Sequence, residues 1–160
     1  MDFSEDDIVL RKYVDSLPHE KKLALAIAIS KIFYFDYQQY SQDNEAADAD
    51  LIMDIIQFAE RSIGKPVEQT EIENFLSDLH PVMPDQDHLE DETTYNAMCA
   101  WAVVVEILEL LLDKNSSHLY QVLHYYIFNK LEGKIEEETE LNDLEPHPEL
   151  FRQSIYDLIK

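Results

Sequence analysis

Two glutamates, Glu106 and Glu109, are the only charged residues between Ala97 and Leu112. A spacing of three residues places both carboxylates on the same side of a helix. In one interpretation they form a paired site in which burial and mutual repulsion raise their pKa values, as general acid–base chemistry requires. In the other, which the sequence favours, they are the single solvated stripe of an otherwise apolar helix.

Histidines offer a second kind of chemistry, metal binding, and the chain has six of them, at positions 19, 80, 88, 118, 124 and 147. None follows a glutamate by three residues, as in the Glu-x-x-His pairs of metal-binding helical bundles, and His-Glu-x-x-His is absent. The best candidate is Asp85-x-Asp87-His88, with Glu90 and Asp91 after it. This segment has neither the glycine nor the register of an EF-hand. We therefore expect a solvated acidic loop, with no metal and no other cofactor.

Nucleophilic catalysis has no support in the sequence. Cys99 is the only cysteine and lies in an apolar segment, where a free thiol is usually an inert core group. The only glycines are Gly64 and Gly133, which excludes G-x-S-x-G nucleophile elbows, P-loops and G-x-G-x-x-G loops. No catalytic residue is assigned, and the sequence predicts a protein that is not an enzyme.

The strongest functional signal is the distribution of charge. The net charge is −22, and no lysine or arginine lies between Lys65 and Lys114, a stretch that carries twelve acids. Such a surface repels nucleic acids and anionic membranes and attracts basic proteins. Tyrosines beside acids can anchor a protein partner. The predicted partner-binding residues are Asp85, Asp87, Glu90, Asp91, Glu92, Tyr37 and Tyr40.

The elements that must position these residues are predicted to be helices. Apolar residues recur at helical spacing, alanines interrupt the strand-like alternation of Leu23 to Ile29, and Gly64 and Pro81 are helix stops. Thr70 and Glu73 form a capping-box pattern. We predict one all-α domain over residues 1–160, a bundle of about seven helices around a central apolar helix at about 91–114. The predicted helices cover 4–14, 18–40, 51–63, 70–79, 91–114, 116–131 and 150–159.

Two segments resemble a known family. The first runs from LALA at 23–26 to the aromatic stretch SKIFYFDYQQY at 30–40, and the second from MPD at 83–85 through the acidic loop to YNAMCAWA at 95–102. They are similar to the YjaG-like family of uncharacterised bacterial proteins, also called domain of unknown function 416. The resemblance covers about half of the chain. It implies an all-α fold and supplies no catalytic residues.

The sequence also favours a soluble cytoplasmic protein. One cysteine permits no intramolecular disulfide, which fits a reducing compartment. The start of the chain lacks the basic and apolar regions of a signal peptide. No apolar run approaches the ~20 residues that span a bilayer.

Three functions remain open at this point. The leading one is an acidic helical protein-binding module, of the immunity type, that neutralises a basic partner. The alternative is a structural or regulatory protein that self-associates, as a homodimer, through an apolar helix face. The third is an unrecognised enzyme or metal-binding protein that uses Glu106, Glu109 and the loop from Asp85 to His88. A buried histidine close to both glutamates would favour this third function.

Overall fold

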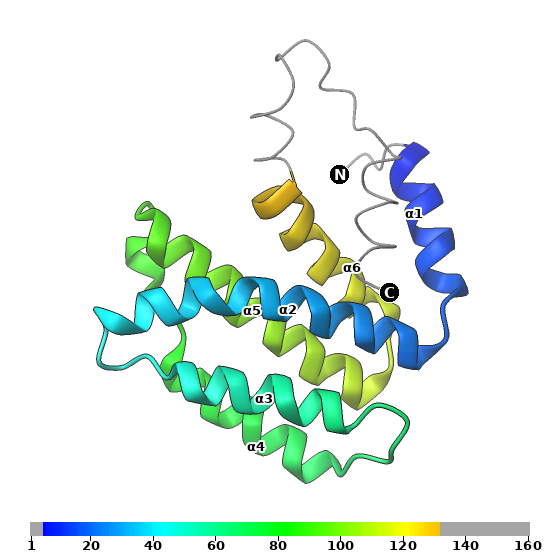
Figure 1. Ribbon diagram of the computed structural model, residues 1–160, viewed down its shortest axis with the longest axis horizontal. Helices are drawn as coiled ribbons and strands as arrows, with labels where there is room; N and C mark the ends of the chain where they lie inside the picture. Colours follow the sequence, from blue (N-terminus) through cyan, green and yellow to red (C-terminus); the bar gives the residue numbers. More distant parts are fainter. Residues whose placement is uncertain (1–4, 132–160) are drawn as a thin grey trace.

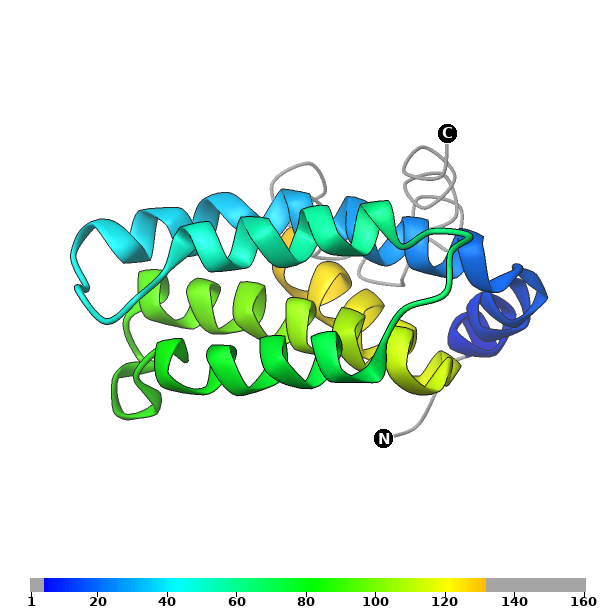
Figure 2. The ribbon, with the colours of Figure 1, turned by 90° about the horizontal axis from the view of Figure 1, so that it is seen from below.

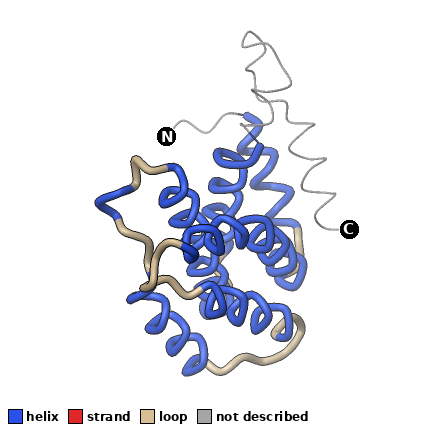
Figure 3. The backbone as a smooth tube through the Cα atoms, turned by 60° about the vertical axis from the view of Figure 1, so that its left-hand side comes forward, coloured by secondary structure: helices blue, strands red, loops and turns tan. Residues whose placement is uncertain are grey.

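The computed structural model describes residues 5–131, and within them the chain is helical with no strand (Figures 1 and 3). The all-α prediction is confirmed, as are the first six predicted helices; the helix predicted at 150–159 lies outside the described residues. The helices are α1 (Glu5–Ser16), α2 (His19–Gln42), α3 (Ala49–Arg61), α4 (Gln69–Leu79), α5 (Glu92–Asp113) and α6 (Ser116–Tyr126). Two 3-10 turns, η1 (His80–Val82) and η2 (Gln86–His88), join α4 to α5, and a π-helix, η3 (Ile127–Leu131), follows α6.

The helices form two layers, and α5 packs against most of the other helices. Figure 2 shows α2 and α3 side by side in one layer, with α4 and α5 in the other. Because α5 packs against α2, α3, α4 and α6, it is the central helix that its apolar sequence predicts. Each large aliphatic side chain buried there contributes about 1.5–3 kcal/mol. The buried residues of α5 are Thr94, Ala97, Cys99, Ala100, Val103, Val104, Ile107, Leu108, Leu110 and Leu111.

A two-residue connection folds α6 back against α5. Lys114 ends α5 in the left-handed region, with φ 58°, and its N–H bonds to the carbonyl oxygen of Leu110. Asn115 then caps α6 by accepting a hydrogen bond from the N–H of Ser117, at 2.9 Å. Asn115 therefore belongs to the start of α6, because its side chain reaches a free N–H of that helix.

Other local predictions need correction. Helix α4 begins at Gln69 after Glu68, so Thr70 is already inside the helix and forms no capping box. Trp101 is only partly buried, although Cys99 is 2% exposed as expected. The indole N–H of Trp101 donates to the carbonyl oxygen of Leu79, at 2.9 Å, which draws the ring toward the end of α4.

The expectation that no segment could span a membrane also needs qualification. Helix α5, with 22 residues, is long and apolar enough by length and composition, and half of its most apolar window is buried inside the bundle. A core helix of a soluble protein has the same properties, so this is weak evidence for a membrane span.

Candidate functional site

The α5–α6 turn brings Glu106, Glu109 and His118 together. The Nδ1 atom of His118 lies 2.7 Å from Oε2 of Glu106 and 3.3 Å from Oε2 of Glu109. The two glutamates lie on one side of α5, and His118 lies in the first turn of α6. The ligand-type atoms of the three residues lie within 4.8 Å of one another. Among the side chains that the structure describes, those of 11–127, 129 and 130, this is the one group of three or more that converges in this way.

A third carboxylate holds the other side of the imidazole. The Nε2 atom of His118 lies 2.9 Å from Oδ2 of Asp113, the last residue of α5. The Oδ1 atom of Asp113 accepts a hydrogen bond from the N–H of Asn115, at 2.8 Å. Asp113 is thus itself oriented by the turn, and it fixes the direction in which Nδ1 of His118 points.

The cluster is half-buried and opens to solvent on one side. The side chains of His118 and Glu106 are 15% and 21% exposed, whereas that of Glu109 is 40% exposed. The solvated-stripe interpretation of the two glutamates is therefore wrong for Glu106, which packs under the imidazole. The solvated-stripe interpretation holds only for Glu109, whose side chain is 40% exposed.

These surroundings change the pKa values of the cluster. Burial raises the pKa of Glu106 above its usual value, and the charges of Glu109 and Asp113 add to this, although the imidazole opposes it. Burial alone would lower the pKa of His118, but its hydrogen bonds to Asp113 and Glu106 outweigh that effect, so the pKa is raised. The hydrogen bond from His118 holds the pKa of Asp113 below its usual value, helped by the N–H of Asn115.

The arrangement allows two chemical states. With no cation bound and below the raised pKa of His118, the imidazole is protonated on both nitrogens and donates to carboxylates on both sides. If a metal ion replaced the Nδ1 proton, Nε2–H would still donate to Asp113, and Nδ1 and the two glutamate oxygens would be the ligands. A carboxylate that receives the second N–H of a ligating histidine is the usual outer partner of such a ligand in metal sites.

A family model described as "Protein of unknown function (DUF416)" matches residues 10–153. The chain belongs to this family. The DUF416 fold is also present in a solved structure, a DUF416 family protein from Shewanella baltica OS155, with a TM-score of 0.73 and 16% sequence identity. The match covers 99% of this chain and 83% of that one, and at this identity it shows the fold alone. None of the curated proteins matches the chain.

The acidic loop of this DUF416 chain forms no comparable cluster. His88 lies 3.5 Å from Asp85 and 3.7 Å from Glu90, and all three side chains are more than half exposed. Asp85 accepts a hydrogen bond from the N–H of Asp87, and Asp91 caps α5 by accepting from the N–H and hydroxyl of Thr94. Asp85 and Asp91 therefore have local structural roles. The five predicted docking acids, Asp85, Asp87, Glu90, Asp91 and Glu92, are all exposed.

The prediction that Tyr37 and Tyr40 bind a partner is wrong, because both side chains are buried. Tyr37 is 0% exposed and Tyr40 is 8% exposed, because both point from α2 into the core. The hydroxyl of Tyr37 donates to the carbonyl oxygen of Val82, at 2.7 Å, and accepts from the N–H of Asp48, at 3.2 Å. Neither tyrosine can anchor a partner from that position.

Sequence reasoning found both glutamates of the cluster but missed His118 and Asp113. The signal was available: a predicted break at Asn115 reverses the chain, so a histidine in the next turn returns toward the preceding helix. The search for Glu-x-x-His failed because that pattern describes ligands on one helix. Here the ligands come from two helices joined by a turn.

Proposed function

We propose that this protein binds a divalent metal ion through Glu106, Glu109 and His118. The observation that carries the proposal is the convergence of these three ligand atoms, with Asp113 orienting the imidazole from behind. Three protein ligands leave further coordination positions for water or a substrate. Glu109, the most exposed of the three, marks the open side.

The ligand set favours a first-row transition metal. One imidazole and two carboxylates suit Zn²⁺, Mn²⁺ or Fe²⁺, whereas Ca²⁺ prefers six to eight oxygen ligands. Ligands of a tetrahedral zinc ion stand about 3.4 Å apart, given metal–ligand distances near 2.1 Å. The spacing of 3.3 Å between Nδ1 of His118 and Glu109 is close to this, and Glu106, at 2.7 Å, needs to move by roughly 0.7 Å.

Charge also supports a cation at this position. Three carboxylates surround a single imidazole, at distances of 2.7, 3.3 and 2.9 Å. Burial raises the pKa of Glu106, which means that the charged form of this carboxylate is destabilised in the folded protein. A divalent ion relieves both the burial cost and the mutual repulsion of the carboxylates.

Thermal unfolding with added metal tests the proposal. After treatment with EDTA and its removal, Zn²⁺ or Mn²⁺ should raise the melting temperature, since a ligand at a hundred times its Kd adds about 2.7 kcal/mol of stability. Mg²⁺ and Ca²⁺ should have little effect. Co²⁺ should give a visible absorption band that reports its coordination by the protein.

The variants H118Q and E106Q should lose the metal response, and H88Q serves as the matched control because His88 is exposed in the acidic loop. A melting temperature that no metal changes would refute the proposal. So would a response that H118Q retains.

A second candidate function is docking of a basic protein, including an immunity-type role, on the acidic loop. It is supported by the exposure of Asp87, Glu90 and Glu92 and by the lack of basic residues between Lys65 and Lys114. Replacing Asp85 and Asp91 by Asn keeps their capping, because Asn caps as well as Asp. A five-site amide variant should therefore fold normally and associate more slowly with a basic partner. An unchanged association rate would reject this function.

A further inference from the structure

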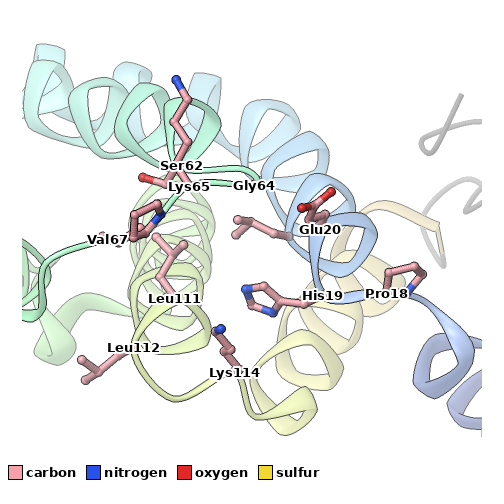
Figure 4. Close-up of a pocket in the computed structure, with 12 residues that line it drawn as sticks. Pro18, His19, Glu20, Ser62, Gly64, Lys65, Val67, Leu111, Leu112 and Lys114 are labelled. Atoms are coloured by element: carbon pink, nitrogen blue, oxygen red, sulfur yellow. The ribbon is translucent and has the colours of Figure 1, made fainter.

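A cleft that could hold a small ligand lies at the start of α2. It has a volume of about 710 Å³ and is enclosed by the first residues of α2, the α3–α4 connection and the end of α5 (Figure 4). That volume falls within the range of small-molecule sites, roughly 300–1,000 Å³. Leu23 and Leu111, 1% and 8% exposed, provide apolar walls.

One residue that lines this cleft, His19, carries a buried polar atom without a partner. Of the side chains that the structure describes, Nδ1 of His19 is the one buried nitrogen or oxygen that makes no hydrogen bond. Figure 4 shows the imidazole pointing from α2 toward Leu111. Native proteins seldom leave such atoms unpaired, because a buried unpaired group costs about 1–3 kcal/mol.

Lys114 contributes a positive charge at the same place. In Figure 4 its ammonium group lies toward His19, whereas the side chain of Lys65 runs away from the centre of the cleft. Lys114 also has a positive φ of 58°, a conformation that suits glycine or asparagine better than lysine. A helix can end in that conformation without a lysine. The positive charge of Lys114 does interact favourably with the negative end of the α5 dipole, and this is its structural role when no ligand is bound.

The start of α2 adds to the positive potential. Pro18 precedes α2, no side chain caps this 24-residue helix, and its first residues, with the positive end of its dipole, line the cleft. Lys22 also lies near His19 and donates to the hydroxyl of Ser116, at 2.8 Å. Burial, then the charges of Lys114 and Lys22, lower the pKa of His19, and Glu20 opposes them. Glu20 is the one acid that lines the cleft, and its side chain is exposed, at the edge beside Gly64.

We propose that this cleft binds a small organic carboxylate, whose head lies between His19 and Lys114 and whose apolar body packs on Leu23 and Leu111. In a chain with a net charge of −22, a cleft where an uncapped helix start, a lysine and an imidazole meet is selective for an anion. The apolar walls favour an organic acid over inorganic phosphate. A bound carboxylate accepts a hydrogen bond from Lys114 and, once the His19 side chain turns to expose its unpaired nitrogen, from Nδ1–H, which satisfies that atom.

Titration of the protein with hexanoate, acetate and inorganic phosphate tests the proposal. EDTA is present throughout, and the imidazole resonances of His19 are followed by NMR. Hexanoate should shift these resonances and raise the pKa of His19. It should also bind more tightly than acetate, since each methylene group that becomes buried strengthens binding roughly fourfold. Phosphate should bind more weakly than hexanoate.

Two variants of Lys114 separate binding from folding. K114N and K114G both remove the charge, and both residues accept a positive φ, so each variant should melt no lower than the parent. Both should weaken hexanoate binding by roughly tenfold or more, the effect of losing one charge-assisted hydrogen bond. K31Q is the matched control, because Lys31 lies roughly 18 Å further along α2 and pairs with Glu60.

Three results would overturn the proposal. The first is the absence of any shift of the His19 resonances with hexanoate. The second is phosphate or acetate binding as tightly as hexanoate, because the apolar walls would then have no role. The third is hexanoate binding that K114N leaves unchanged.

Discussion

Replacing His118 by Gln should destabilise the metal-free protein more at low pH than at high pH. The pKa of His118 is raised in the folded state, so the folded protein holds the proton more tightly than the unfolded chain. The stability that this adds is fully present below the ordinary histidine pKa, near 6.5, and is lost as pH rises through the raised value. The raised pKa of Glu106 makes the wild-type protein itself less stable as pH rises, because folding disfavours the charged carboxylate.

The size of the effect follows from the geometry. The bond from Nδ1 of His118 to Glu106, at 2.7 Å, joins side chains that are at most about a fifth exposed. A charge-assisted bond of this kind contributes about 1.5–3 kcal/mol. Asp113 is 51% exposed, so its pair with Nε2 is reduced by solvent to about 0.2–1 kcal/mol. We expect H118Q to lose about 2 kcal/mol near pH 6, and less above the raised pKa of His118.

Urea unfolding in EDTA, followed by circular dichroism between about pH 5.5 and 8.5, measures this difference. Asp113 does not confuse the result, because its lowered pKa makes its contribution disappear only at pH values below its ordinary range. H88Q is again the control and should show no such pH dependence. A difference between wild type and H118Q that is constant over this range would refute the assigned hydrogen bonds. With saturating Zn²⁺ the trend should reverse, because protons then compete with the metal.

Three further predictions concern single positions. G64A should lower the free energy of unfolding by about 1–2 kcal/mol, because Gly64 has φ +72° and an added Cβ would lie 3.2 Å from Oε1 of Glu20. Urea unfolding measures this loss, and an unchanged midpoint would contradict the prediction. Cys99, 2% exposed and with a pKa that burial raises, should react with a thiol reagent only as fast as the protein opens, so rapid labelling of the native protein would show that it is accessible. D91A should cost about 1 kcal/mol by removing the cap of α5 while D91N costs little, and equal losses in the two variants would argue against capping.

The central helix was predictable because its sequence decides its environment. From Ala97 to Leu112 only Glu106 and Glu109 are charged, so burial on nearly every side follows from composition. The chain reversal near Asn115 was predictable for a similar reason, since the residue competes with the helix for backbone hydrogen bonds. Boundaries agreed to within a residue or two where such signals were strong.

Tyr37 and Tyr40 show what periodicity leaves open. Their spacing indicates one face of a helix but does not say whether that face points into the core. The answer depends on Val82 and Asp48, which approach the hydroxyl of Tyr37 from segments 45 and 11 residues away in the chain. A tyrosine hydroxyl can be buried when distant segments supply its hydrogen-bond partners. The sequence of α2 alone does not show which segments these are.

The connection at Lys114 and Asn115 positions both proposed sites, yet it uses different atoms for each. The metal cluster needs the chain reversal, which Asn115 supports by capping α6 and Asp113 by accepting the N–H of Asn115. The carboxylate cleft needs the side chain of Lys114 and not its backbone conformation, which glycine adopts more readily. K114G should therefore keep the turn, the distance between His118 and Glu106, and the metal response, while it removes the charge from the cleft. The two sites share one turn and are chemically separable at a single residue.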